Sequence, residues 1–296
     1  MKASWLLLAA AAVHAQDASP SPFTARGYFE SRNFVYPREA PGDSGRIVSE
    51  ELLRVESQWK ARPSFRLNLS LDARFDSHRQ FERVLRLDWF DRRLQRPASS
   101  VRRLSAVYSK SGLTLEAGRQ FIRWGKADLL NPTDRFAPKD FLNVVNTDFL
   151  GVWAARATYE RGVNTFDLVW QPFFTPSRSP LLAQRWTVPP PGLAAFRLED
   201  LGFRLPGRGQ WGARYSRVSR GYEFSLSLFD GFNHLPLFEG GFRPAPVPSV
   251  TLQRFFARML MGGADVAIPL RWFTLKAEAA HFASSTPQAD EYTQYV

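Results

Sequence analysis

Few residues of this chain have the types and spacing that chemistry requires. The sequence contains no cysteine, which excludes a thiol nucleophile, a disulfide scaffold, a zinc finger and an iron–sulfur site. Its four histidines, His14, His78, His234 and His281, are too far apart in sequence to give the short spacing of a metal site. We therefore expect neither a metal nor a cofactor.

Arginine is the most abundant residue whose side chain could take part in binding or catalysis. The 296 residues include 39 Lys and Arg, of which six are lysine, against 28 Asp and Glu, and the net charge is +11. The guanidinium group binds carboxylates and phosphates through two parallel hydrogen bonds. The basic residues alternate with acidic ones along the chain and form no cluster, so we do not expect nucleic acid as a partner.

The elements that must position these side chains show a period of two. Between residues 65 and 75 every odd position is apolar and every even position is polar. Successive side chains of a β-strand point to opposite faces, so this pattern predicts a strand with one apolar and one polar face. The same alternation, clear or weaker, predicts about eleven strands in all. They are 23–36, 50–61, 65–75, 101–110, 112–125, 150–161, 163–173, 209–218, 222–228, 251–268 and 273–279. A phase change at Gly118 and another at Gly262–Gly263 predict glycine bulges.

Short and long connections alternate between these strands. The short turns fall at Arg62-Pro63, Ser111-Gly112, Arg161-Gly162, Arg220-Gly221 and Ile268-Pro269. The long connections lie near 37–49, 76–100, 126–148, 175–208 and 232–250. This parity is typical of up-and-down antiparallel transmembrane β-barrels, which have short turns at one end and long loops at the other. We expect an all-β barrel of this type without an internal domain boundary, narrowed by the connection 126–148.

The N-terminal segment has the features of a secretory signal peptide. Lys2 is followed by an apolar stretch that ends in Val13-His14-Ala15, an Ala-x-Ala-like cleavage site. No later stretch has the roughly 18 uncharged apolar residues of a transmembrane helix. We expect residues 1–15 to be the signal peptide and residues 16–296 to form the barrel domain, placed in the outer membrane of a Gram-negative-type bacterium.

Residues 101–143 carry a resemblance to a known family. A strand that ends in Gly118-Arg119-Gln120 is followed by Trp124-Gly125 and by Asn131-Pro132-Thr133-Asp134. This span resembles a hairpin of porin-like bacterial outer-membrane proteins and, more loosely, of the alginate-export porin. The resemblance implies a barrel of about 14 to 18 strands.

The end of the chain departs from this family. A family barrel usually closes on a strand with a terminal aromatic residue, whereas residues 291–296 look like the first residues of a further strand. An odd number of strands also conflicts with the even counts of bacterial single-chain barrels. We interpret the sequence as a fragment that lacks several C-terminal strands.

The polar face of each predicted strand would line the lumen. The basic residues on it that we expect to line the pore are Arg119, Arg123, Arg66, Arg74, Arg156, Arg214 and Lys276. Rings of basic residues favour anions in pores. The alternative is that these charges form ion-paired ladders within the wall, or contact lipopolysaccharide from outside.

These observations favour a porin-like outer-membrane channel for passive diffusion of small hydrophilic solutes, anionic ones among them. The expected partners are outer-membrane lipid, lipopolysaccharide and further copies in a homo-oligomer. One alternative is a soluble secreted β-sandwich binding protein, because alternation alone fits both architectures. A second, weaker alternative is an outer-membrane barrel enzyme. It would need a Ser/His pair, but His281 is too near Ser284 and Ser285 in sequence to suggest one. We expect a protein that is not an enzyme and has no catalytic residue.

Overall fold

The computed structural model describes most of the chain after residue 20. The described residues are 21–40, 45–78, 80–127, 130–145, 147–182, 184–187, 192, 196–244, 246, 248–284 and 292–296. The predicted signal peptide, residues 1–15, lies outside them. A search of the described residues finds no helix with the length and apolarity needed to cross a membrane.

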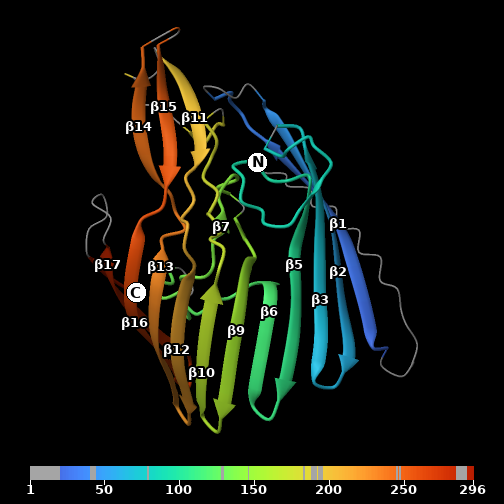
Figure 1. The fold of residues 1–296 in the computed structure, drawn as a ribbon, viewed down its shortest axis with the longest axis vertical. Helices are drawn as coiled ribbons and strands as arrows, with labels where there is room; N and C mark the ends of the chain where they lie inside the picture. Colours follow the sequence, from blue (N-terminus) through green and yellow to red (C-terminus); the bar gives the residue numbers. More distant parts are fainter. Residues whose placement is uncertain are drawn as a thin grey trace.

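One large antiparallel sheet dominates the described part of the chain (Figure 1). Its strands, in spatial order, are β1 (Phe23–Val35), β2 (Ile47–Arg62), β3 (Phe65–Asp76), β5 (Ser99–Lys110), β6 (Leu113–Gln120), β9 (Val152–Arg161), β10 (Asn164–Gln171), β12 (Gln210–Ser219), β13 (Tyr222–Phe232), β16 (Arg258–Pro269), β17 (Thr274–Ser284) and β18 (Tyr292–Tyr295). The two-residue strand β4 (Leu87–Asp88) joins β5 in parallel. The order in space follows the order in sequence, so the fold is all-β and up-and-down, as predicted.

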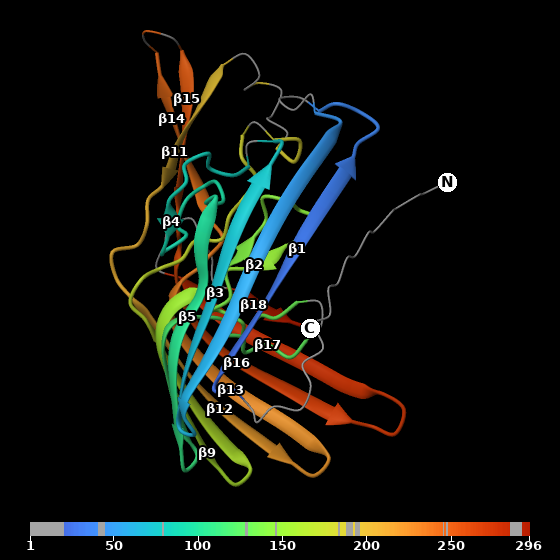
Figure 2. The same ribbon diagram turned by 90° about the vertical axis from the view of Figure 1, so that its right-hand side faces the viewer.

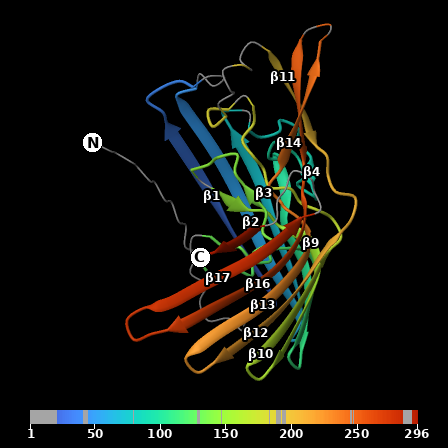
Figure 3. The same cartoon turned by 90° about the vertical axis from the view of Figure 1, so that its left-hand side faces the viewer.

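The sheet curls strongly but does not close. Figures 2 and 3 show β1 and β2 on one side and β16 and β17 sweeping round toward them, so that the sheet has a concave side, the hollow. Its two edge strands are β1 and β18, which are not hydrogen-bonded to each other. A β-sandwich would instead pack two sheets face to face.

Five hairpin turns lie together at one end of the sheet, at the bottom of Figure 1. They join β2 to β3, β5 to β6, β9 to β10, β12 to β13 and β16 to β17. In the β5–β6 turn, Ser111 and Gly112 have φ values of 50° and 83°, the left-handed conformations that a tight hairpin needs. The longer connections gather at the other end, so the predicted parity is correct.

The long connections contain strands that the sequence pattern did not reveal. The segment 251–268 is two strands, β15 (Ser249–Phe255) and β16, rather than one. Strand β15 pairs with β11 (Arg197–Phe203) and β14 (Leu237–Arg243) in a separate three-stranded sheet, above the main sheet in Figure 1. Two further short strands, β7 (Lys139–Asp140) and β8 (Asp148–Phe149), pair with each other. The β11–β15 pairing joins residues about fifty positions apart in parallel, which no local period reports.

The expected glycine bulges are wrong. The pairings of β6 with β5 and β9 run through Gly118 without a register shift, and those of β16 run through Gly262 and Gly263. Gly118 instead has a φ of 121°, and a Cβ there would collide with the carbonyl oxygen of Leu104. This conformation favours glycine at position 118, whereas Gly262 and Gly263 have no such φ.

The two faces of the sheet have inverted polarity. On β13, Leu226 and Leu228 are 54% and 55% exposed, whereas Ser225 and Ser227 between them are buried. The same holds on β10, where Leu168 is exposed and Asp167 is buried. The apolar positions of the alternating pattern therefore face outward, and the polar positions face the hollow.

Candidate functional site

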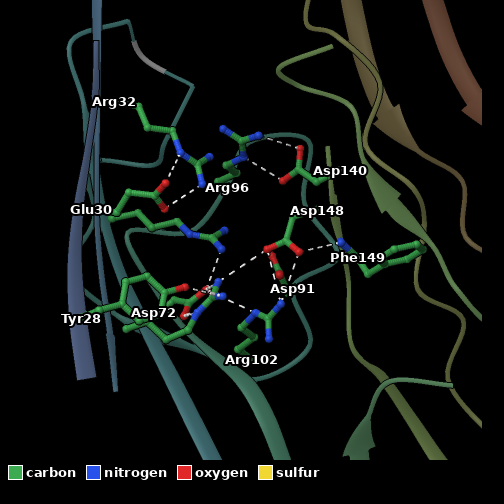
Figure 4. Close-up of polar contacts among 12 residues, drawn as sticks. Tyr28, Glu30, Arg32, Asp72, Asp91, Arg96, Arg102, Asp140, Asp148 and Phe149 are labelled. Atoms are coloured by element: carbon green, nitrogen blue, oxygen red, sulfur yellow. Dashed lines mark hydrogen bonds and ion pairs between the residues drawn. The ribbon is translucent and has the colours of Figure 1, made fainter. Parts of the chain in front are cut away.

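The hollow side of β1, β2 and β3 carries a charged rung at mid-height. Arg54 and Asp72 are register partners on β2 and β3, so alternation places both side chains on the inner face. Arg54 Nε donates to Asp72 Oδ1 at 2.6 Å, and Arg54 Nη2 donates to Asp72 Oδ2 at 2.9 Å. Arg54 Nη1 also donates to the hydroxyl of Tyr28 on β1 at 2.8 Å. Figure 4 shows this rung within a larger network.

The larger network comes from the long connections, which fold into the hollow. Asp140 accepts from Arg96 at 2.7 and 3.1 Å and from Arg178 at 3.0 Å. Arg178 also pairs with Asp91, and Asp91 accepts from Arg119 at 3.3 Å. All five side chains are almost completely buried. These bonds join one or two described residues of each of three connections, those before β5, before β9 and after β10, to Arg119 on β6.

Electrostatics within this network favours the charged forms. Burial by itself would raise the pKa of Asp140, but Arg96 and Arg178 hold that pKa well below its usual range. The pKa of Asp91 is lowered in the same way by Arg178 and Arg119, against the effect of burial. Both carboxylates are therefore ionised and paired at neutral pH.

An upper cavity of about 210 Å³ opens beside the network. Its charged lining consists of Arg32, Arg54, Arg74, Arg96, Glu30, Glu50, Glu51, Asp140 and Asp148. Arg32 and Glu30 form a two-pronged pair at 2.6 and 2.7 Å, visible in Figure 4. With four basic and five acidic side chains, the lining is close to neutral.

A lower cavity of about 440 Å³ lies along the same three strands, toward the hairpin turns. Its lining is polar and includes Arg26, Glu56, Gln58, Asn68 and Ser70. Tyr28 and Arg54 of the rung line the upper cavity on the side that faces the lower one. Polar side chains therefore line both cavities along the inner face of β1–β3.

The opposite part of the hollow is filled by the segment after β6. Ile122, Trp124 and Phe136 are buried in one apolar cluster with inward-facing residues of the strands, such as Phe229 and Met261. The ring of Phe136 lies edge-on to Trp124 and to Phe229, each at 5.1 Å between centroids. The described residues of 121–137 thus pack, through Ile122, Trp124 and Phe136, against the inner wall over β9, β10, β13, β16 and β17.

One buried carboxylate fixes this inward segment. Glu278 on β17 accepts hydrogen bonds from the backbone N–H groups of Lys126, Ala127 and Thr133 at 3.0, 3.3 and 2.7 Å. The hydroxyl of Thr133 donates to the same carboxylate at 2.8 Å. Glu278 is 2% exposed, so the four bonds are shielded from water.

Three of the predicted pore-lining residues are paired across the inner face. Arg74 donates to Asp72 at 2.6 Å, and Arg156 donates to Asp167 at 2.6 Å. Arg214 forms an ion pair with Asp265 at 2.8 Å. Trp124 Nε1 also donates to Asp167, which ties the inward segment to this ladder.

The other predicted residues have different surroundings. Arg119 is buried and paired with Asp91, as described above. Arg123 is half exposed, 3.3 Å from Asp134 and with its guanidinium 4.2 Å from the centroid of Phe149. Arg66 and Lys276 are exposed near the hairpin end. The structure brings Arg74 and Arg119 into the neighbourhood of one network and places Arg156 and Arg214 on a second ladder, across the sheet.

Sequence reasoning missed the residues that the connections contribute. Asp91, Arg96, Asp140, Asp148 and Arg178 lie outside the long strands, where the period of two assigns no face. The one available signal was local density, because residues 76–100 hold an unusual number of Arg and Asp side chains for a loop.

No metal site and no catalytic pair was found in the part of the chain that the structure describes. No group of three acidic or histidine side chains there could hold a metal ion. The ring of His281 contacts the hydroxyl of Thr293 at 3.0 Å, and Ser284 donates to the carbonyl of Arg258 at 2.6 Å. Ser285 lies outside the described residues.

No family model matches the chain, and no curated protein matches its sequence. Among solved structures, the chain is similar to OmpF of Salmonella typhi in a complex with daunomycin, at 9% identity and a TM-score of 0.43. That likeness covers 89% of this chain and 66% of OmpF, so the chain spans about two thirds of the length of that porin. Two mutants of the Rh. blastica porin align over 92% of this chain and 87% of their own, at 10% and 9% identity and a TM-score of 0.34.

Proposed function

We propose that this chain forms a porin-like channel of the bacterial outer membrane that passes small hydrophilic solutes by passive diffusion. The inverted polarity of the curved sheet carries the proposal. A protein folded in water buries apolar side chains, but this sheet exposes Leu168, Leu226, Leu228, Leu260 and Leu275 and buries charged ones. Such an outer face is stable where lipid chains surround it.

Exposed aromatic side chains support this placement. Near the hairpin end, Tyr108, Tyr159 and Tyr222 are each about 40% exposed. Toward the other end, Trp170 and Trp211 are 58% and 46% exposed and are register partners on β10 and β12. Aromatic girdles at both interfaces, with aliphatic side chains between them, are typical of outer-membrane barrels.

The two polar cavities along β1–β3 suggest the course that a solute takes. The inward segment 121–137 fills the other side of the hollow and leaves this side lined by charged and amide groups. A solute on this course passes the Arg54–Asp72 rung at the lower side of the upper cavity. Only the first part of the predicted narrowing 126–148 packs on the other side, whereas Asn143 bonds to Glu50 on β2 and Asp148 lies beside Arg54.

The preference for anions stays a prediction. Of the seven basic residues expected to line the pore, five are paired with a carboxylate of the described chain. A paired guanidinium contributes less field to the lumen than a free one. Lipid and lipopolysaccharide contacts on the outer face and homo-oligomer formation belong to the same proposal.

Planar-bilayer recording on the complete protein tests the channel. We expect stepwise, ohmic conductance when the purified protein inserts. Protein that is fully membrane-inserted by protease protection, yet never conducts, would contradict the proposal. Release of the protein from membranes by salt or alkali without detergent would favour the soluble alternative instead.

A further inference from the structure

Arg92, at the rim of the outer face, has no hydrogen-bond or ion-pair partner among the described residues. The guanidinium carbon of Arg92 lies 5.1 Å from the ring centroid of Phe90 and 5.4 Å from that of Phe173. No hydrogen bond or ion pair joins Arg92 to any residue that the structure describes, although most arginines around it are paired with carboxylates. Two aromatic faces hold this cation in place while its N–H donors remain unused.

The aromatic neighbours place Arg92 on the outward side. The ring of Phe90 packs edge-on against Phe173, at 5.4 Å between centroids, and at a tilt against Trp153, at 5.8 Å. Trp153 occupies an outward position of β9, alternating with the buried Val152 and Ala154, and its indole N–H donates to the carbonyl of Trp89 at 2.9 Å. Arg92 therefore lies at the loop end of the outer face, near the level of Trp170.

Several apolar side chains of the connection that contains Arg92 are exposed at the protein surface. Leu85 is 92% exposed, Val84 is 60% exposed and Trp89 is 47% exposed. Arg86 and Arg93 lie nearby in the connection and pair with Glu82 at 3.4 and 2.8 Å. The segment thus combines side chains that insert among lipid chains with one unpaired cation at the depth of the headgroups.

We infer that Arg92, held by the rings of Phe90 and Phe173, binds the phosphate of an anionic membrane lipid; these three residues are the Arg92 site. The planar guanidinium offers parallel N–H donors that match a phosphate, and no carboxylate of the described chain competes for them. The exposed Val84, Leu85 and Trp89 of the same connection support the contact of this region with lipid. The inference rests on the proposed function, because it requires the outer face to contact lipid.

Native mass spectrometry of the purified protein in a neutral detergent tests the site. The probes are dioleoylphosphatidylglycerol and, at equal concentration, the net-neutral dioleoylphosphatidylcholine. We expect the wild type to retain the anionic lipid in preference, and Arg92→Gln to weaken its retention about fivefold, the effect of one cation near a membrane surface. Arg92→Lys keeps the charge but loses the forked geometry, so its retention should fall between the two.

Arg220→Gln is the matched control. It removes the same charge from an exposed position in a hairpin turn at the opposite end of the sheet, and it should leave retention of the anionic lipid unchanged. Equal retention by wild type and Arg92→Gln, or an equal fall in Arg220→Gln, would overturn the inference. Displacement of the lipid by millimolar inorganic phosphate would overturn it too, because the site would then take free phosphate.

The two proposals fail separately. If the protein conducts in bilayers but shows no lipid preference, the proposed Arg92 site is wrong and the proposed channel stands. If it retains the anionic lipid selectively and inserts but never conducts, the proposed channel is wrong and the proposed Arg92 site stands.

Discussion

At the scale of single residues, buried ion pairs are the feature on which the stability of the long connections depends. Arg96, Arg178 and Asp140 are each nearly inaccessible to water, and both arginines donate to Asp140, at 2.7 to 3.1 Å. A buried ion pair adds little net stability when complete, but removal of one partner leaves an uncompensated charge. Removal of such a carboxylate therefore lowers the stability of the fold by more than the net stability that the complete ion pair adds.

Asp140→Asn should destabilise the fold by about 3–5 kcal/mol, because two buried guanidinium groups then lose their counter-charge. Asp148→Asn is the control, since the Asp148 side chain is 44% exposed and lies 3.3 to 3.5 Å from Arg102 and Arg54. Its effect should stay below about 1 kcal/mol. Denaturant unfolding of both variants in detergent measures the difference, and equal midpoints would refute the assignment.

His234 should make stability depend on pH. Its nitrogens lie 2.6 and 2.9 Å from the carbonyl oxygens of Thr175 and Arg135, in a connection beyond the end of β13. Burial, with a smaller effect of the Arg135 charge, lowers the pKa of His234 to about 4, although both carbonyls favour the protonated ring. The folded state thus takes up the proton less readily than the unfolded state, whose pKa is about 6.5.

Stability from this group is present above about pH 6.5 and is lost as the pH falls toward 4, by about 3 kcal/mol in all. Midpoints of thermal unfolding between pH 7 and 4 measure the loss, and His234→Gln should remove most of it. An unchanged pH profile in that variant would assign the titration to other groups.

At the scale of elements, the inward segment 121–137 depends on the wall that holds it. Its backbone N–H groups bond to Glu278, its indole bonds to Asp167, and Lys126 lies 2.6 Å from Glu223. The segment has no long strand of its own, so these side chains of the sheet decide its position.

Glu278→Ala should free the segment and widen the channel. Three backbone donors and one hydroxyl lose their acceptor, at about 1–3 kcal/mol for each donor left buried without a partner. We expect a larger single-channel conductance with stronger fluctuations, together with a lower unfolding temperature. Glu239→Ala, an exposed residue of the upper sheet, should change neither. Unchanged conductance in a folded Glu278→Ala protein would show that this segment does not limit the pore.

At the scale of the whole molecule, the sheet separates an apolar outside from a charged inside. The net charge of +11 is not concentrated in the upper cavity, where five acidic side chains face four basic ones. The electric field on a permeating ion therefore depends on how many basic side chains are neutralised by acidic ones, and not on the number of arginines.

Reversal potentials in a salt gradient measure this balance. We expect a modest anion preference, reduced further in Arg66→Gln, whose exposed cation lies near the hairpin end. Arg156→Gln should change selectivity less, because its charge is paired with Asp167. Cation selectivity of the wild type would remove the anion preference and leave the channel proposal in place.

The sequence by itself determined most strands of the main sheet, their order and their two faces, although it joined β15 and β16 into one strand. A strand repeats every two residues, so a pattern such as that of residues 65–75 states which side chains share a face before any contact is known. Hairpin pairing is local, and the short turns therefore fixed which strands are neighbours.

Only the tertiary structure decided what those faces touch. Alternation does not say whether the apolar face points inward or outward. Leu226 faces outward and Ser225 faces inward because of the direction in which the whole sheet curves. The burial of Asp91, Arg96, Asp140 and Arg178 arises where three separate connections meet. Such contacts join residues up to 87 positions apart, and they depend on the fold and not on any local period.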